Sequence, residues 1–297
     1  MAMKVLTIIV SYNFMPWIDH CLGSLKNSAY PTDVIVIDNA SSDATVTTLG
    51  QRYPWVKLVA NDSNLGFGRA NNIGIQYAIK HQYDAVLLLN QDAWIEPDTL
   101  DQLVNAAQRN PDYGIVSPLH LTGQGDGLDK GFAHYTGIKD LHLLPGDEIV
   151  PVPFINAAIW FISLEVLKRV GLFDPVFYHY GEDIDLTHRM SCYHYKTGYV
   201  PSAIGFHDRD DRPVDRHHFF RSEYVYHLAE YTNINYSLAK AFSMSILAVF
   251  KKVLTSLMHG RADDAKTYAA QAFRLLCQTS AVCSSRKRSR QVRLSNY

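Results

Sequence analysis

Three acidic side chains stand close together near the middle of the chain, in the stretch VFYHYGEDIDLTHRM (176–190). Glu182, Asp183 and Asp185 follow a glycine and three ring-bearing side chains. Like charges at this spacing repel one another, so the chain either solvates these acids or uses them. Asp183 begins a predicted helix over 183–192, where the helix dipole favours its ionised form. There it either caps the helix or accepts a proton from an attacking hydroxyl group.

The neighbours of Asp183 favour a functional site over a simple helix cap. The preceding Tyr-His-Tyr run (178–180) can both stack and hydrogen-bond, as carbohydrate recognition requires. Asp185 stands four residues before Arg189, the spacing at which two side chains pair on one face of a helix. We therefore expect a structural ion pair for Asp185 and a catalytic role for Asp183.

Four polar segments follow predicted strands in the first 110 residues. The strands are apolar runs, typical of strands covered on both faces, at 4–10, 34–37, 56–60 and 85–89. Helix-compatible stretches alternate with them, which implies right-handed βαβ units, at 17–27, 44–52, 68–81 and 97–109. The polar segments are SYN (11–13), DNASSD (38–43), NDSNLGFGRANN (61–72) and NQDA (90–93). Because ligands of open parallel sheets bind beyond the carboxyl ends of the strands, we expect one polar cleft there.

Three residues at strand ends each allow a functional and a structural interpretation. Asp38 either hydrogen-bonds the imide N–H of a uracil or thymine ring or forms a turn before the next helix. Asp92, two residues after Asn90, either holds a divalent cation together with a diphosphate or is a solvated turn residue. His207, after a predicted strand over 200–206, is either a ligand of metal or diphosphate or a structural histidine.

The stretch NLGFGRANN contains Gly66 and Gly68, which invites comparison with the loops of dinucleotide-binding oxidoreductases. That fingerprint needs a third glycine where Asn71 stands, and it follows the first strand of its fold, whereas this stretch follows the third. Instead of NAD binding we expect a loop that leads from a nucleotide cleft into a helix, with Gly66 allowing close approach of the backbone.

Beyond the first 110 residues the pattern is less regular. Residues 111–153 lose periodicity and are predicted to form irregular loops across the mouth of the cleft, with one strand at 114–117. The other expected elements are a strand at 157–162, a helix at 164–170 and a largely helical region over 216–280.

Composition limits the class of protein. Apolar residues make up 47% of the 297 residues, and the formal net charge of −1 argues against a dedicated nucleic-acid binder. The four cysteines are scattered, which argues against a disulfide framework or a zinc site and indicates a reducing compartment. The apolar run at 5–10 is too short for a signal peptide and is predicted to be a buried strand. We therefore expect a cytoplasmic protein.

Charge divides the chain into an expected catalytic domain over 1–211 and a helical region with a basic tail over 212–297. The first part carries 14 Lys and Arg against 24 Asp and Glu, and the second carries 14 against 5. A basic end suggests contact with an anionic surface. The apolar segment 238–258 has an uncharged run of only ten residues, so it either lies in a membrane interface or packs on the catalytic domain. The tail, 286–293, either touches anionic lipid or is a disordered solubilising segment.

Taken together, the motifs resemble those of the family 2 glycosyltransferases, in order and over residues 4–210. The matching segments are VSYN (10–13), VIDNASSD (36–43), NLGFGRANNIGI (64–75), LLLNQDAW (87–94), INAAIWFISLEVLKRVGLFDPVFYHYGEDIDLTHRM (155–190) and GFH (205–207). The resemblance is to the rhamnosyltransferase-like branch, which builds bacterial surface polysaccharides. It implies an α/β GT-A fold, Rossmann-like, with a mostly parallel sheet flanked by helices, here followed by a C-terminal helical extension.

The resemblance also implies roles for matching positions. Residues implied to bind the nucleotide or the substrates are Ser11, Tyr12, Asn13, Asp38, Asn64, Gly66, Asn71, Asn90, Asp92 and Glu182. Asp183 matches the acid that serves as catalytic base, with Glu182 near the acceptor. Asp92 resembles the last acid of the DxD motif and, with His207, is implied to hold Mg²⁺ or Mn²⁺. Two departures stand out: Asn90 replaces the first acid of that motif, and an unusually acidic DRDDRP (208–213) follows His207.

The implied reaction is an inverting transfer from a nucleotide-diphosphate sugar, with dTDP- or UDP-sugars as candidate donors and dTDP-rhamnose among them. The acceptor would be a hydroxyl of a glycan or a lipid-linked glycan, reached at the inner face of the cell membrane, with peripheral contact through the C-terminal helices and basic tail. Two alternatives remain open. A nucleotidyltransferase would want a basic glycine-rich loop near the first strand, but SYNFMPW (11–17) has no Arg or Lys. A non-catalytic sugar-nucleotide or glycan-binding module would lack hydrolysis dependent on Asp183.

Overall fold

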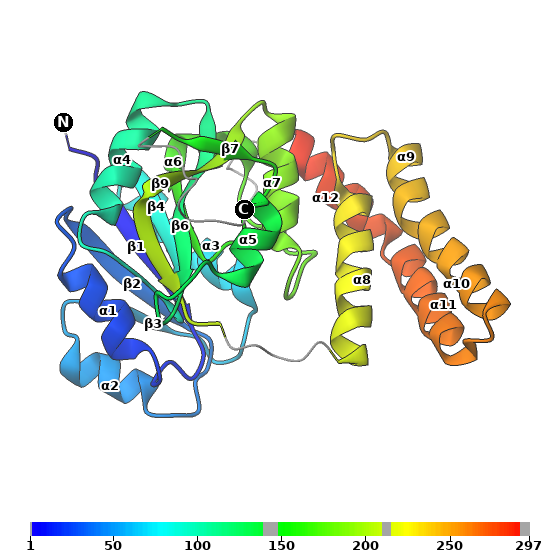
Figure 1. Cartoon of the computed structure of the whole chain (residues 1–297), viewed down its shortest axis with the longest axis horizontal. Coiled ribbons are helices and arrows are strands. Elements are labelled where there is room, and N and C mark those ends of the chain that lie inside the picture. The colour runs from blue at the N-terminus through cyan, green and yellow to red at the C-terminus, as the bar shows by residue number, and fades with distance from the viewer. Residues whose placement is uncertain (1, 139–147, 210–214, 292–297) are drawn as a thin grey trace.

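The computed structural model describes residues 2–138, 148–209 and 215–291. Figure 1 shows a sheet flanked by helices and, on one side of it, a group of helices from the C-terminal part of the chain. The first elements are β1 (Val5–Ser11), α1 (Ile18–Lys26), β2 (Thr32–Asp38), α2 (Thr45–Arg52), β3 (Lys57–Ala60), α3 (Phe67–Lys80), β4 (Ala85–Asn90), β5 (Ala93–Ile95) and α4 (Thr99–Arg109). They follow the predicted alternation of strands and helices, with the three-residue β5 as an addition.

The second group of elements completes the sheet. It comprises β6 (Tyr113–Thr122), α5 (Lys130–Thr136), β7 (Val150–Val152), β8 (Ile159–Ser163), α6 (Leu164–Val170), α7 (Glu182–Cys192) and β9 (Lys196–His207). The prediction of irregular loops over 111–153 is therefore wrong for much of that range. The ten-residue β6 shifts register between Pro118 and Leu119, which interrupts its pattern, and β7 is only three residues long. The predicted loop residues 139–147 lie outside the described part of the chain.

The sheet is parallel in one half and mixed in the other. The strand order is β3-β2-β1-β4-β8-β6-β9-β5, with β7 pairing β9. The first four strands are parallel, as predicted, whereas β8 runs antiparallel to β4 and β6, and β5 runs antiparallel to β9. A mostly parallel sheet is thus correct for the first half only. The antiparallel β5 pairs Ala93 with His207, which brings the end of β9 to the rim that follows β4.

Two hydrophobic clusters cover the two faces of the sheet. One packs α1, α2 and α4 against it, and the other packs α3, α6 and α7. Gly74 in α3 shows how close this packing is, because an added Cβ would lie 2.5 Å from a side-chain carbon of Ile8 in β1. Burial of long apolar strands on both faces fixes the strand ends, and therefore the rim that carries the polar segments.

The C-terminal part is helical, as predicted. Its elements are α8 (Arg216–Thr232), α9 (Leu238–Phe242), a π-helical turn (Ser243–Leu247), α10 (Ala248–Met258), α11 (Ala262–Cys277) and α12 (Thr279–Arg290). One hydrophobic cluster joins these helices to Phe177 of the preceding part, so packing crosses the predicted boundary at residue 211.

The described part of the basic tail is helical, and two of its arginines are engaged within the molecule. It forms α12, in which Arg286 is 4% exposed and donates hydrogen bonds to three backbone carbonyls, those of Tyr231, Asn233 and Tyr236. Arg288 donates to both carboxylate oxygens of Asp174, at 3.0 and 3.1 Å. These guanidinium groups hold α12 against the molecule, so the described part of the tail is not a disordered segment, while Lys287 and Arg290 are exposed. Arg293 lies outside the described residues.

Candidate active site

The rims of β1 and β2 are joined through the carboxylate of Asp38. Its Oδ1 accepts a hydrogen bond of 2.8 Å from the Ser11 hydroxyl, and its Oδ2 accepts one of 2.9 Å from the backbone N–H of Ser41. The Ser41 hydroxyl donates to the same carboxylate, and Asp38 is only 1% exposed. Asn13 adds a second link, because its Oδ1 accepts a hydrogen bond from the N–H of Ser42. These predicted site residues form one connected rim, in which protein donors already occupy part of the Asp38 carboxylate.

The rim of β4 is locked to that of β1 by Gln91, which sequence analysis did not single out. Its Oε1 accepts a hydrogen bond of 2.8 Å from the Tyr12 N–H, and its Nε2 donates one of 3.1 Å to the Tyr12 carbonyl. This pair of bonds holds Asn90 and Asp92 beside the first strand end. The Tyr12 side chain is 48% exposed and so remains available for stacking.

The loop after β3 touches the aromatic run that precedes α7. Gly66 has a φ of +81°, and a Cβ there would lie 1.9 Å from the carbonyl oxygen of Tyr178. The Tyr178 hydroxyl donates a hydrogen bond of 3.1 Å to the Asn64 carbonyl, while the Asn64 side chain accepts one of 2.9 Å from the Gly66 N–H. Only glycine permits this approach, which brings two segments more than 100 residues apart into one wall of the site.

Two further predicted substrate-binding residues, Asn71 and Glu182, are buried, as Ser11 and Asp38 are. Asn71 is 1% exposed, and its amide donates a hydrogen bond to the Phe67 carbonyl within α3. Glu182 is 5% exposed and lies against α3, where a Cβ on Gly68 would stand 3.4 Å from it. Burial, and then the negative charge of Asp183, raise the pKa of Glu182 to about 8. Its Oε2 has no hydrogen-bond partner among the described residues.

Asp183 lies at the N-terminus of α7, beside the sheet rim. Its carboxylate accepts a hydrogen bond of 2.8 Å from the backbone N–H of Ile184, and the backbone N–H of Ala157 lies near enough to lower its pKa. The next residue, Ala158, accepts a hydrogen bond of 2.8 Å from the N–H of Asn90 at the end of β4. Asp183 is therefore close to the rim that carries Asp92. Burial raises the pKa of Asp183 above its ordinary value, although the backbone N–H groups act in the opposite direction.

Tyr135 of α5 extends the site on the side of Asp183. Burial, and then the negative charges of Asp183 and Asp129, raise the pKa of its phenol, while the nearby guanidinium of Arg209 lowers it. The ring is 42% exposed and packs edge-on against Phe154, with 4.7 Å between the centroids. The residues of α5 show no helical periodicity, so Tyr135 and Asp129 were not among the predicted residues.

His207 lies between two carboxylates. Its Nε2 is 3.5 Å from Oδ1 of Asp92, and its Nδ1 is 3.4 Å from Oδ2 of Asp129. The ring is 4% exposed, and burial alone would lower its pKa, but the two carboxylates outweigh burial and raise the pKa to about 9. Asp129 itself is fixed as the N-cap of α5, where it accepts a hydrogen bond of 2.7 Å from the Phe132 N–H.

Asp92 and His207, the two predicted metal ligands, thus lie together at the rim. Within the described ranges, no three His, Cys, Asp or Glu side chains are grouped to hold a metal ion. The pair fits a half-site that a substrate diphosphate would complete, because hard divalent cations often keep few protein ligands. Asp208, the first acid after His207, does not interfere with this pair of residues. Its carboxylate accepts a hydrogen bond of 2.8 Å from the Trp17 indole. Asp210 and Asp211 lie outside the described residues.

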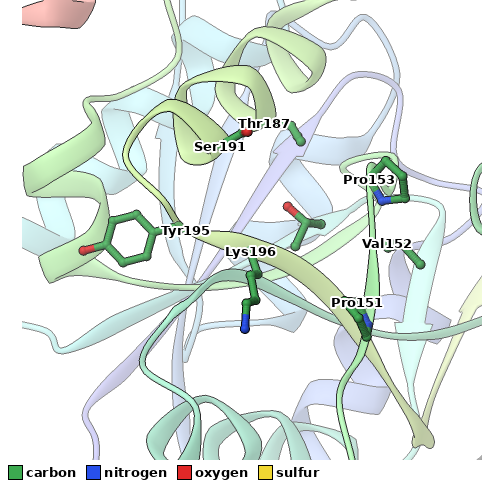
Figure 2. A pocket seen from close by; sticks show the side chains of 8 residues that line it. Pro151, Val152, Pro153, Thr187, Ser191, Tyr195 and Lys196 are labelled. Carbon is green, nitrogen blue, oxygen red and sulfur yellow. The ribbon is translucent and has the colours of Figure 1, made fainter. Parts of the chain in front are cut away.

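A hollow of about 380 Å³ lies farther along α7, away from Asp183, and Figure 2 shows the side chains around it. It is lined by Pro151, Val152, Pro153, Thr187, Ser191, Tyr195, Lys196 and Thr197. None of the predicted site residues lines it, and Lys196 is already paired with Asp112 at 2.7 Å. We assign the site to the strand rim instead, where the chemically active side chains meet.

Comparison with known proteins identifies the family of the chain. Residues 7–171, more than half of the chain, match the family described as "Glycosyl transferase family 2". Over 232 residues the chain is 28% identical to the N-acetylglucosaminyl-diphospho-decaprenol L-rhamnosyltransferase of Mycobacterium tuberculosis (strain H37Rv), covering 68% of this chain and 75% of that protein.

Solved structures share the fold at low sequence identity. TarS 1-349 of S. aureus, solved in complex with UDP-GlcNAc, has a TM-score of 0.60 at 14% identity, covering 98% of this chain and 93% of that one. GalNAc-T7, solved with UDP, GalNAc and Mn²⁺, has a TM-score of 0.62 at 16% identity, covering 76% and 48%. The fold is therefore of the GT-A type, with a C-terminal helical region. The chain belongs to glycosyltransferase family 2 and is a rhamnosyltransferase-like transferase.

Proposed function

We propose that the protein is an inverting hexosyltransferase that uses a dTDP- or UDP-sugar, with dTDP-rhamnose among the candidate donors. The acceptor is a hydroxyl of a glycan or a lipid-linked glycan in bacterial surface polysaccharide synthesis. The similarity to a rhamnosyltransferase whose name specifies a decaprenol-linked substrate supports this acceptor class. Four free cysteines are typical of a reducing compartment, in keeping with a cytoplasmic enzyme that works at the inner face of the membrane.

One observation carries the proposal: the carboxylate of Asp183 lies beside the backbone N–H of Ala157, and the carbonyl of the adjoining Ala158 accepts a hydrogen bond from the Asn90 N–H. The predicted base therefore lies beside the strand end that leads to Asp92. A remote or solvent-facing Asp183 would have been incompatible with action on a sugar held at that rim.

Asp183 acts as the general base in the proposed reaction. It takes the proton of the acceptor hydroxyl, whose oxygen attacks the anomeric carbon from the face opposite the nucleoside diphosphate. The sugar–phosphate bond breaks as the new glycosidic bond forms, and the diphosphate leaves with the bonding electrons. Burial raises the pKa of Asp183, which makes its carboxylate a stronger base than that of an ordinary aspartate.

The leaving diphosphate is placed at Asp92 and His207. These two residues would hold Mg²⁺ or Mn²⁺, which neutralises the negative charge that develops on a leaving diphosphate. Asp129 orients His207 from the other side of the ring, because carboxylates commonly hold the second ring nitrogen of a metal-binding histidine. The base and ribose would lie over the connected rim of Ser11, Asp38 and Tyr12, with Asp38 as the acceptor for an imide N–H.

The substitution Asp183→Asn tests this proposal. We expect at least about a hundredfold loss of transfer rate, because positioned bases contribute on the order of 10²–10⁴-fold. Binding of UDP or dTDP, measured by calorimetry, should be unchanged, since the substitution preserves shape and the residue does not contact the nucleotide. Asp62→Asn, at an exposed carboxylate, is the matched control. Unchanged turnover in Asp183→Asn would remove Asp183 from the role of base. A non-catalytic module is excluded when wild-type protein hydrolyses a nucleotide sugar and Asp183→Asn does not.

A further inference from the structure

The segment Leu238–Met258 forms one continuous helix with two different faces. The residues buried against neighbouring helices are Ala241, Ser245, Ile246, Val249 and Ser256. Large apolar side chains on the other side are exposed, among them Leu254 at 62%, Leu257 at 55% and Met258 at 85%. The helix is the one among the described residues that is long and apolar enough to cross a membrane, but only 28% of its most apolar window is buried. Much of its apolar character is therefore directed outward, although Ala241, Ile246 and Val249 belong to the C-terminal hydrophobic cluster.

The antiparallel neighbour α11 continues the exposed surface with Phe273, which is 69% exposed, and Leu276, which is 40% exposed. We call the combined surface the hairpin face; it comprises Met244, Leu247, Phe250, Leu254, Leu257, Met258, Phe273 and Leu276. Most of the strongly exposed apolar side chains without a polar tip, within the described ranges, belong to this face. Figure 1 shows α10 and α11 farthest from the sheet. Contiguous apolar surface of this kind marks an interaction site.

The charge of the hairpin face distinguishes between two possible binding partners, a second copy of the chain and an anionic lipid surface. The segment Leu238–Met258 contains three lysines and no acid, and Lys251 is exposed between Phe250 and Leu254. Arg261, 58% exposed at the turn into α11, lies 3.9 Å from Asp264, and Lys252 pairs with Glu223. Attraction to an anionic surface therefore depends most on Lys251. A second copy of the chain would bring these like charges together across the interface, which costs affinity. An anionic lipid surface instead attracts them, and lysine side chains can extend to the headgroups while their stems remain in apolar surroundings.

We propose that the hairpin face lies in the interfacial layer of an anionic bilayer, with its apolar side chains inserted and Lys251 and Arg261 among the headgroups. Amphipathic helices insert about 5–10 Å in this way. The inference rests on the proposed lipid-linked acceptor, whose delivery such contact would serve. It also assigns the contact to α10 and α11 and not to the basic tail, because Arg286 and Arg288 are engaged within the molecule.

Vesicle flotation of the full chain tests the assignment. Wild-type protein should float with phosphatidylcholine vesicles that contain phosphatidylglycerol. The double substitution Leu254→Ser and Leu257→Ser should weaken partitioning by at least about tenfold, given the transfer free energy of a leucine side chain. Both positions are exposed, so the thermal unfolding midpoint should not fall. Trp55→Ser, which removes an exposed apolar side chain at 40% exposure outside the hairpin face, is the matched control and should float like wild type. Equal flotation of the double variant and wild type would overturn the assignment.

The contribution of charge is measured separately. Lys251→Glu should reduce flotation with the phosphatidylglycerol vesicles and leave the weaker binding to pure phosphatidylcholine nearly unchanged. Sedimentation velocity without vesicles should show that the wild-type protein and the double variant have the same oligomeric state. A wild-type oligomer that dissociates in the double variant would assign the hairpin face to a second copy of the chain and overturn the membrane assignment.

Release of nucleoside diphosphate from UDP- and dTDP-sugars, measured without vesicles, distinguishes failure of the inference from failure of the proposed function. The double variant should retain this release, because the hairpin face is remote from Asp183. Wild-type protein that releases the nucleotide but does not float with anionic vesicles refutes the inference and leaves the proposed function standing. Wild-type protein that floats, and loses flotation in the double variant, supports the inference even where no donor of the panel is consumed.

Discussion

At the scale of single residues, Asp183 and Glu182 are adjacent carboxyl groups with different surroundings. Backbone N–H groups hydrogen-bond the carboxylate of Asp183, whereas Oε2 of Glu182 has no such partner among the described residues. Burial raises the pKa of both, but the unsupported Glu182 reaches about 8. The two adjacent carboxyl groups can therefore take different roles, and Asp183 is the one that lies at the rim.

The raised pKa of Glu182 makes folding stability depend on pH. The folded protein keeps the proton up to about pH 8, whereas the unfolded chain loses it near 4.5. Stability from this group is therefore fully present below 4.5 and is lost as pH rises towards 8. Glu182→Gln stays neutral, so its free energy of unfolding in urea should fall less than that of wild type over this range. Glu165→Gln, at a side chain 80% exposed, should retain the wild-type slope. An unchanged slope in Glu182→Gln would contradict the raised pKa.

Asp92 carries the second prediction at this scale. Asp92→Ala should weaken binding of UDP or dTDP at least about tenfold when Mn²⁺ is present. Mutation of groups that support a metal site typically reduces metal affinity about 10- to 100-fold. Without metal, calorimetry should find similar affinities for the variant and wild type. Asp98→Ala, at an exposed acid a few residues further along, provides the comparison. Equal metal-dependent affinity in Asp92→Ala would remove this residue from the site.

At the scale of elements, the early strands and helices were predictable because long apolar runs and alternating helices leave strong patterns. The same patterns placed Asp92 and His207 at strand ends, and the structure brings both to one rim. Gln91, Asp129 and Tyr135 could not be found in this way. Gln91 acts through its contact with a backbone 79 residues away, and the other two belong to a short helix without periodicity. The ion pair between Asp185 and Arg189 was predictable because the two residues are four apart on one helix. The structure confirms it, with 2.8 Å between a guanidinium nitrogen and Oδ2.

The contact between the loop after β3 and the aromatic run gives a prediction for Gly66. Gly66→Ala should lower the free energy of unfolding by about 1–3 kcal/mol, because the new Cβ would overlap the Tyr178 carbonyl and the φ is positive. Nucleotide binding should weaken as well, since both walls must shift. Gly50→Ala in α2 has open space around it and should be neutral or slightly stabilising. Urea unfolding and calorimetry measure the two effects; equal stability of Gly66→Ala and wild type would refute the close approach.

At the scale of the whole molecule, Arg288 ties the last helix to the catalytic part. Arg288→Ala should cost about 3 kcal/mol of folding free energy, since it leaves the Asp174 carboxylate, 1% exposed, without its cation. Arg288→Lys should recover part of this loss, and Lys287→Ala, at the exposed neighbour, should cost little. Urea unfolding compares the three variants. A loss in Arg288→Ala no larger than in Lys287→Ala would show that the ion pair is dispensable.

The hydrophobic cluster that joins Phe177 to the C-terminal helices bears on how this enzyme can be divided. A fragment ending at residue 211 would retain every predicted catalytic side chain, yet it would expose Phe177, now 2% exposed, only six residues before Asp183. Such a fragment would expose apolar surface to water next to Asp183. The carboxylate of Asp174 would lose its ion pair with the guanidinium of Arg288. Recombinant production of residues 1–211 alone is therefore expected to give an aggregation-prone, poorly active protein. The C-terminal helices are needed to keep the catalytic part folded.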